Sequence, residues 1–209
     1  MVMGCDINKD MVDFAKANYS SEDINFIVLD IAGEVPGSLR GKFDHAFSFF
    51  VLHWVKNQEI AFKNIYDLLG NDGDCLLIVV GQAALYDGFR DLAQSKKWRG
   101  LLEENEKYVS PYHDGEDSVS ELKEMLLKIG FSTVDINEKP VAFSHDNEDS
   151  FRGSLRALIP FNIPEEQFDD FLDDLAYAMQ EGDHKKYNLE KSSSDLTFNF
   201  NNIAIYIKK

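Results

Sequence analysis

Two aspartates follow short apolar stretches early in the chain, and both are suited to contact a nucleotide. Asp6 follows the stretch VMGC, and Asp30 follows the stretch INFIVL. If both stretches are parallel strands, the two carboxylates lie at the carboxyl edge of a sheet, where doubly wound folds bind their ligands. A carboxylate there accepts hydrogen bonds from ribose hydroxyls or from an adenine amino group, and Ile31 is placed to cover the adenine ring. The alternative for both residues is an ordinary turn or helix-capping acid.

The pair His53-Trp54 is the second feature with chemical potential. It follows the run SFFVL, at a point where a strand should give way to a loop. Imidazole and indole each carry an N–H group, and two such neutral donors in a pocket wall can hold a carboxylate. The alternative is that Trp54 packs in the core while His53 satisfies a local backbone carbonyl.

The segments that must position these residues alternate between two periodicities. Strand-like apolar runs cover 2–7, 24–30, 43–50 and 74–80, and helical spacing covers 11–19 and 59–69, with Asn8 as the first N-cap and residues 70–73 as a turn. Strands that are apolar on both faces and alternate with helices indicate a parallel sheet covered by helices on each side. The first half of the chain is therefore predicted to be α/β.

The second half is predicted to be mainly helical before it ends in a strand. Helices are expected at 86–102, 120–129, 151–158 and 164–180, with Gly130 as a C-cap, and strands at 131–143 and 196–207. Pro140 places the first of these strands at the edge of its sheet, because proline cannot donate to a neighbouring strand. Residues 191–194, Lys-Ser-Ser-Ser, are predicted to be a polar loop.

The composition indicates a globular protein and argues against several partners. The chain has 209 residues, 44% of them apolar, and a net charge of −16. This acid excess argues against broad binding to nucleic acid or to an anionic membrane, and no apolar run approaches the roughly 20 residues of a membrane span. Cys5 and Cys75 lie in apolar runs, so we expect two buried thiols in a reducing compartment, a cytoplasmic location and no metal site.

Four segments, taken in order, give the chain a family resemblance. GCDIN, FIVLDI, FDHAFSFFVLHWV and AFKNIYDLLGNDGDCLL occur in this order at suitable separations. Together they resemble the class I S-adenosylmethionine-dependent methyltransferases. Within that class the chain looks most like the insect juvenile hormone acid methyltransferases, on the strength of FDHAFSFFVLHW and the later Val109-Ser110-Pro111-Tyr112. The resemblance covers the chain from residue 1 to residue 209.

This resemblance implies a fold, a cofactor and a set of site residues. The implied fold is a Rossmann-like α/β sheet, mostly parallel with an antiparallel C-terminal strand, in one domain over 1–209, with 82–130 and 144–190 as a helical cover over the acceptor. The implied cofactor is S-adenosylmethionine. Its ribose would lie at Asp6 and Ile7, its adenine at Asp30 and Ile31, and its methionine part near Ser48 and Phe49, while His53, Trp54, Trp98 and Tyr112 would bind the acceptor.

The reaction implied by the resemblance is methyl transfer to the carboxylate of a small apolar acid, of the juvenile hormone acid or farnesoic acid type. A carboxylate is already a nucleophile near neutral pH, and a sulfonium methyl group is already activated. Placement of the two in line therefore does most of the work, and no catalytic acid, base or nucleophile is expected. Neutral donors such as His53 and Trp54 orient a carboxylate without the strong ground-state hold of an arginine pair.

The chain departs from the family pattern at its start. That pattern begins with a strand and a Gly-rich loop whose backbone approaches the cofactor, whereas here no two glycines are separated by one residue and the first strand carries Asp6. The missing strand would lie between the strand of Asp6 and the strand at 43–50. We therefore expect an N-terminally truncated sheet that binds S-adenosylmethionine weakly, with its two halves either closed up or open at the centre.

Three other functions stay open from the sequence. A methyltransferase for another small carboxylic or fatty acid differs only in the acceptor cover. A non-catalytic binding or regulatory protein derived from the enzyme is favoured by the absent glycine loop. A nicotinamide-dependent oxidoreductase also uses an acid at a strand tip, but the Gly-rich fingerprint of that class is absent as well.

Overall fold

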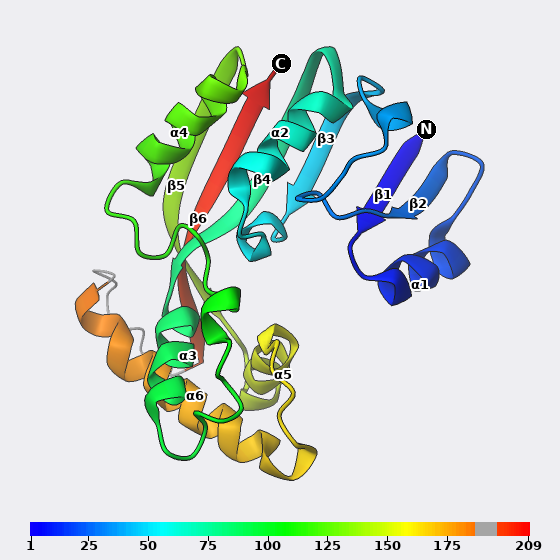
Figure 1. Ribbon diagram of the computed structural model, residues 1–209. Coiled ribbons are helices and arrows are strands. Elements are labelled where there is room, and N and C mark those ends of the chain that lie inside the picture. The colour runs from blue at the N-terminus through cyan, green and yellow to red at the C-terminus, as the bar shows by residue number, and fades with distance from the viewer. Residues whose placement is uncertain (187–195) are drawn as a thin grey trace.

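The computed structural model describes the backbone of residues 1–186 and 196–209 and the side chains of 1–180 and 196–209 (Figure 1). The predicted loop at 191–194 lies outside the described residues. In chain order the elements are β1 (Val2–Asp6), α1 (Lys9–Tyr19), β2 (Ile24–Val28), β3 (Phe43–Phe49), α2 (Gln58–Leu68), β4 (Leu69–Ala83), α3 (Ala84–Gln94), α4 (Ser118–Ile129), β5 (Thr133–Ser144), α5 (Glu148–Leu158), α6 (Glu165–Lys186) and β6 (Thr197–Lys208). Short 3₁₀ turns, η1 (Gly37–Leu39), η2 (Leu52–Trp54) and η3 (Asn105–Tyr108), lie between them.

The strands form two sheets. β1 pairs in parallel with β2, and a second sheet has the order β3-β4-β6-β5. In this second sheet β3 and β4 are parallel, whereas β6 runs antiparallel to both of its neighbours. The predicted antiparallel C-terminal strand is thereby confirmed, and so is the edge position of the strand that contains Pro140.

The two sheets lie side by side without joining (Figure 1). Among the described residues, β1 pairs only with β2 and β3 only with β4, so each has an unpaired edge and the centre stays open. Apolar side chains are exposed on both sides of this opening, including Val2 and Phe47 at 61% and 66%. The prediction that Cys5 is buried is wrong: Cys5 is exposed on β1, because no described element covers that part of the strand, whereas Cys75 is buried on β4.

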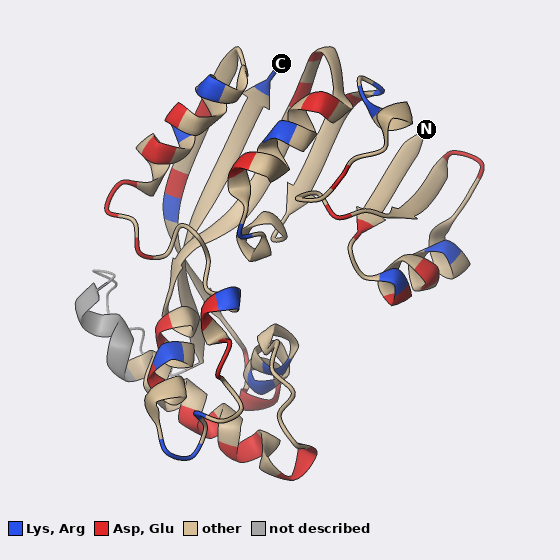
Figure 2. Ribbon diagram, in the orientation of Figure 1, with Lys and Arg blue, Asp and Glu red and all other residues tan. Residues whose placement is uncertain are grey.

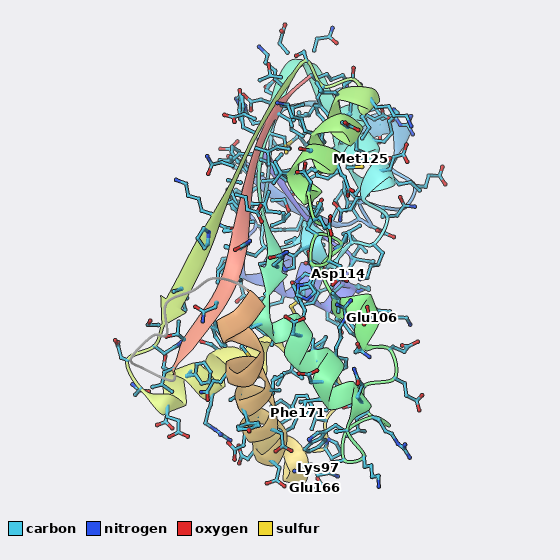
Figure 3. The ribbon with its side chains drawn as sticks, turned by 90° about the vertical axis from the view of Figure 1, so that its left-hand side faces the viewer. Lys97, Glu106, Asp114, Met125, Glu166 and Phe171 are labelled. Carbon is cyan, nitrogen blue, oxygen red and sulfur yellow. The ribbon has the colours of Figure 1, made fainter. Side chains whose placement is uncertain are left out.

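One face of the four-stranded sheet is covered by α2 and α4, which lie on the same side of it (Figures 1 and 3). The alternation of β4 sends Cys75, Leu77 and Val79 to this side. We call the resulting cluster the sheet core; it consists of Leu52, Phe62, Ile65, Leu69, Cys75, Leu77, Val79, Tyr112, Leu122, Leu126, Phe131, Ile203, Ile205 and Ile207.

A second cluster, the helical core, lies where β4 continues directly into α3 and meets α5 and α6 (Figure 1). It consists of Ala83, Ala84, Leu85, Tyr86, Phe89, Leu92, Trp98, Leu102, Val109, Phe151, Leu155, Ile163, Phe168, Phe171, Leu172, Leu175, Met179 and Phe198. Gly88 lets α3 approach α6 closely, because a Cβ there would stand 2.9 Å from the side chain of Leu175. No helix among the described residues is long and apolar enough to cross a membrane.

Local capping explains several boundaries. Asn8 accepts hydrogen bonds from two N–H groups at the start of α1, and Gly130 ends α4 at a φ of +120°. Two predicted boundaries are wrong. The predicted helix 86–102 ends at Gln94, because Ser95 turns back onto the carbonyl of Leu92. The predicted turn at 70–73 lies within β4, as an irregularity opposite β3 that includes Asp72 at a φ of +64°.

Candidate functional site

The structure brings Asp6 and Asp30 together at the carboxyl ends of β1 and β2. Asp6 is paired in register with Val28, and its carbonyl accepts from the N–H of Leu29, the residue before Asp30. Both carboxylates are exposed, and each uses one oxygen to accept a backbone N–H two residues on, at 2.8 and 2.9 Å. The second oxygen of each accepts no hydrogen bond from any described residue. Two acceptor oxygens are thus available at neighbouring strand tips.

The first part of the loop after β2 is tied to the main body by the side-chain amide of Asn64. Asn64 of α2 is 8% exposed, and its Nδ2 donates to the carbonyls of Ile31 and Gly33, both at 2.8 Å. Ile31 itself packs against the sheet core, whereas Ile7 is 67% exposed beyond β1. The isoleucine expected beside adenine is therefore held firmly, and the one beside Asp6 is not.

The end of β3 carries the next predicted residues. Ser48 is half-buried, and Phe49 is 48% exposed. Phe50, which follows, adopts a φ of +57°, a left-handed conformation that costs energy in a residue with a side chain. Its N–H donates to the carbonyl of Ile78 on β4, which holds the chain in this turn. The strained residue redirects the chain from β3 into η2.

His53 is held in one tautomer at the end of β4. Its Nδ1 accepts the N–H of Val80 at 3.3 Å, so the neutral ring carries its proton on Nε2. The ring is 3% exposed, and this burial lowers the pKa of His53 to about 4. No described residue forms a hydrogen bond with Nε2. At neutral pH His53 is therefore an uncharged donor without a protein acceptor.

Trp54 lies directly against His53, with ring centroids 4.9 Å apart. Tyr86 and Tyr108 each contact it edge-on at 6.4 Å, and the ring is half-buried against the helical core. Its indole N–H donates to no described residue. Two N–H donors without a described acceptor thus lie on consecutive residues of η2.

The other two predicted acceptor residues are used differently. Trp98 is 1% exposed, and its indole N–H donates to Asp174 at 2.7 Å. Tyr112 is 7% exposed, and its hydroxyl donates to Oε1 of Gln58 at 2.5 Å. Their polar atoms are therefore occupied within the protein.

Sequence reasoning missed three buried polar residues near His53: Gln58, Ser110 and His113. His113 lies in the loop before α4 and is fully buried, with Nδ1 accepting from Ala83 and Nε2 near Asp87 at 3.0 Å. The position of Gln58, directly after the helix cap Asn57, does not reveal from the sequence that its side chain is buried. The one sequence signal for this region is the family resemblance of residues 109–112, VSPY.

The arginine beside this region is engaged by acids. Arg90 donates to both carboxylate oxygens of Glu106 and both of Asp114, at 2.7–2.8 Å (Figure 3). Acidic residues elsewhere lie on helices, loops and strands, and α6 carries several of them (Figure 2). Asp169 and Asp173 of α6 are exposed and pair with Arg152.

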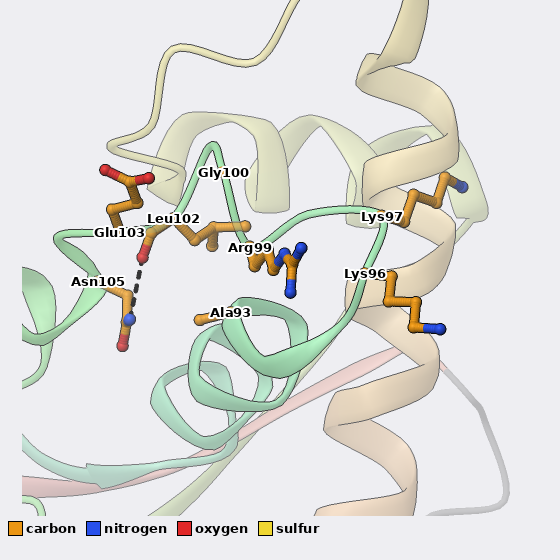
Figure 4. A pocket seen from close by; sticks show the side chains of 8 residues that line it. All are labelled: Ala93, Lys96, Lys97, Arg99, Gly100, Leu102, Glu103 and Asn105. Carbon is orange, nitrogen blue, oxygen red and sulfur yellow. Dashed lines mark hydrogen bonds between the residues drawn. The ribbon is translucent and has the colours of Figure 1, made fainter.

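A surface pocket of about 590 Å³ lies away from the strand tips, after α3 (Figure 4). Lys96, Lys97 and Arg99 line it, and Lys97 already pairs with Asp170 and Asp174. A second pocket of about 550 Å³ lies between α5 and α6. Neither is lined by His53 or Trp54, so the chemistry of the residues, rather than the depth of a hollow, marks the candidate site.

Comparison with known proteins gives this geometry a context. Residues 1–77 match a family model described as a methyltransferase domain. The chain is 38% identical to juvenile hormone acid O-methyltransferase of Bombyx mori, over all of this chain and 76% of that protein, and 31% identical to the Drosophila melanogaster protein of the same name, over 88% of this chain and 66% of that one. A putative methyltransferase structure from Bacillus halodurans superimposes with a TM-score of 0.65 at 13% identity, over 99% of this chain and 82% of that one.

Proposed function

Because the chain belongs to the juvenile hormone acid O-methyltransferase family, we propose that it transfers a methyl group from S-adenosylmethionine to the carboxylate of a small apolar acid, of the juvenile hormone acid or farnesoic acid type. The observation that carries the proposal is the pair of unused, neutral N–H donors on His53 and Trp54. They lie in η2, shortly after β3. The carboxyl ends of β1 and β3 point towards the same side of the molecule (Figure 1).

The residues present fit the nucleoside part of S-adenosylmethionine, which is the cofactor. Carboxylates only accept hydrogen bonds, and ribose hydroxyls and the adenine amino group are donors. Asp6, beside Ile7, holds the ribose in this proposal, and Asp30 with Ile31 holds adenine. Ser48 and Phe49 lie near the methionine part. The cofactor supplies the activated methyl group, and the chain supplies its placement.

The acceptor carboxylate lies at η2 in this proposal. Imidazole Nε2–H and indole Nε1–H each donate to one of its oxygens, which leaves a lone pair directed at the methyl group. Since the charge of the carboxylate is lost as the ester forms, a charged partner would hold the substrate more tightly than the transition state. A histidine kept neutral by burial avoids this preferential binding of the charged substrate.

The cover of the acceptor is assigned to 82–130 and 144–190. Trp98 and Tyr112 contribute to it through packing, since their polar atoms are bonded within the protein. Within the first range, α4 packs against β5 and α2. We place the reaction in the cytoplasm, a reducing compartment in which cysteines such as Cys5 and Cys75 stay as thiols.

The proposal is tested by transfer of labelled methyl from S-adenosylmethionine, at saturating cofactor, to farnesoic acid, juvenile hormone acid and a medium-chain fatty acid. Trp54→Phe keeps a ring and removes one N–H, and the loss of a hydrogen bond to a charged group predicts a fall in kcat/KM of roughly tenfold to a hundredfold. Tyr108→Phe is the matched control, because its ring also packs on Trp54.

Each alternative gives a different result in the same assay. Preference for the fatty acid identifies another acceptor. Binding of farnesoic acid without transfer identifies a non-catalytic protein. Equal activity of Trp54→Phe and wild type removes Trp54 from the site.

A further inference from the structure

Residues 109–113, which carry the VSPY similarity, contain buried polar groups that methyl transfer does not use. Ser110 is 3% exposed and His113 is 0% exposed, and the hydroxyl of Tyr112 is hydrogen-bonded. We call this segment the strap. Its buried polar side chains bond to the end of β4, to α3 and to Gln58 of α2, which follows η2.

The strap grips the end of β4 at the residue that fixes His53. The hydroxyl of Ser110 donates to the carbonyl of Val80 at 2.7 Å, while the N–H of the same Val80 donates to His53 at 3.3 Å. Three residues on, His113 accepts the N–H of Ala83 at 3.3 Å and is bonded to Asp87 in the first turn of α3. The strap therefore holds the strand end that selects the tautomer of His53.

The strap also grips η2 itself through one glutamine. Tyr112 donates to Oε1 of Gln58, and the amide presents Nε2 to the other side. There Nε2 donates to the carbonyl of Leu52 at 2.7 Å and to that of Val55 at 2.5 Å. These two carbonyls bracket His53 and Trp54, and because carbonyls only accept, they fix the orientation of the amide that clamps both ends of the turn. The hydroxyl of Tyr112 completes the clamp by satisfying Oε1, which has no other donor among the described residues.

Both η2 and the strap span the two cores. Leu52 and Tyr112 belong to the sheet core, whereas Val109 belongs to the helical core and Trp54 packs against it. A shift of one core relative to the other would therefore move His53 and Trp54 unless something joins the two. Ser110 and His113 make that join, through their bonds to the helical end of β4 and to α3. The hydrogen bonds of Gln58 and Tyr112 then hold η2 to the sheet core.

We propose that Tyr112 and Gln58 are positioning residues, which keep the two N–H donors of η2 aimed at one acceptor carboxylate. The role of the aimed donors in binding an acid rests on the proposed function. The hydrogen bonds that hold η2 do not depend on a ligand. This positioning role also gives the VSPY segment a task that packing by itself does not require, because an apolar residue would fill the place of Tyr112.

The test removes one hydroxyl. Tyr112→Phe keeps the ring, and Tyr66→Phe is the matched control, since Tyr66 packs against the same core and its hydroxyl bonds to no described residue. Nitrogen spectra of the histidine rings report the tautomer of His53, identified by its absence in His53→Gln. Proton spectra show only two indole N–H signals, because the chain has 2 tryptophans.

We expect Tyr112→Phe to shift His53 towards mixed tautomers and to displace the Trp54 indole signal, while Trp98 and the Tyr66→Phe protein stay unchanged. Gln58→Leu should give the same changes, and the double variant no more than either. Farnesoic acid should bind the Tyr112→Phe protein about tenfold more weakly.

Two results overturn the inference. One is a Tyr112→Phe protein whose His53 and Trp54 signals match wild type. The other is equal displacement by Tyr66→Phe, which would mean a general loss of packing. The spectra are recorded without ligand, so they test the inference whether or not the protein binds farnesoic acid. If wild-type protein does not bind the acid, that result contradicts the proposed function and not the inference.

Discussion

Two regions of the molecule hold their candidate site residues with different firmness. One is the N-terminal unit, which consists of β1, α1 and β2, and the other is the four-stranded sheet. α1 buries only Val12, and the strand-tip aspartates are exposed and held by single turns. In the larger sheet the equivalent strand tip carries His53, which is 3% exposed and bonded to β4. The comparison teaches that the strand tips that hold the nucleoside in our proposal are loosely built, whereas η2, which holds the acceptor in it, is fixed by the hydrogen bonds of buried side chains.

The largest effect should come from the cores. Phe62 is 0% exposed in the sheet core, so Phe62→Ala should lower the free energy of unfolding by about 3–5 kcal/mol. Phe14 of α1 is 58% exposed, and Phe14→Ala should change it by no more than about 0.5 kcal/mol. Urea denaturation measures both, and equal losses would end the contrast between the two regions.

The pH dependence of stability should come next. The pKa of His53 falls to about 4 on folding, from about 6.5 in the unfolded chain, so the unfolded state binds more protons between these values. Stability should therefore fall as the pH falls from 6.5 to 4, by about 3 kcal/mol for this group.

His53→Gln should flatten that slope, and pH-dependent urea denaturation measures it. His45, on the open face of the sheet, serves as the control, because its bond to Asp74 raises its pKa and gives the opposite sign. A His53→Gln protein with an unchanged slope would show that the ring is hydrated.

The join between the two regions should have a smaller effect. Asn64→Ala leaves the carbonyls of Ile31 and Gly33 without their donor, and we expect a loss of about 1–3 kcal/mol in the free energy of unfolding. Hydrogen exchange of the loop after β2 should rise while that of β4 stays the same. Uniform exchange over both regions would show that they unfold as one.

The smallest effect should fall on cofactor binding. Asp6→Asn keeps the oxygen that accepts from Asn8 and loses the charge and one acceptor, so calorimetry should show S-adenosylmethionine binding weakened by roughly tenfold. Asp10→Asn, on the exposed first turn of α1, is the control. Identical affinities of the two variants would remove Asp6 from the ribose site.

The sequence predicts what depends on neighbours along the chain. The strands, the caps at Asn8 and Gly130 and the edge position of Pro140 follow from local geometry, and each is confirmed. The exposure of Cys5 depends on which distant elements cover β1, and the burial of His113 depends on partners 30 and 26 residues away. Such distant pairings have no pattern in the residues themselves.

The same division holds for the site. Residue type alone shows which hydrogen bonds a side chain can form, and it singles out Asp6, Asp30, His53 and Trp54. In the structure each of them has an acceptor oxygen or an N–H donor without a described partner. Trp98 and Tyr112 look equally suitable, but their polar atoms are bonded to Asp174 and Gln58. Whether a donor is free depends on packing between distant segments.

The account depends most on Trp54 offering its N–H to an acid, and titration of the protein with farnesoic acid tests this directly. The two indole N–H resonances report on Trp54 and on Trp98, whose N–H is bonded to Asp174. We predict a saturable shift of the Trp54 resonance alone, absent when the methyl ester replaces the acid. A shift confined to Trp98, or equal shifts with acid and ester, would contradict the account.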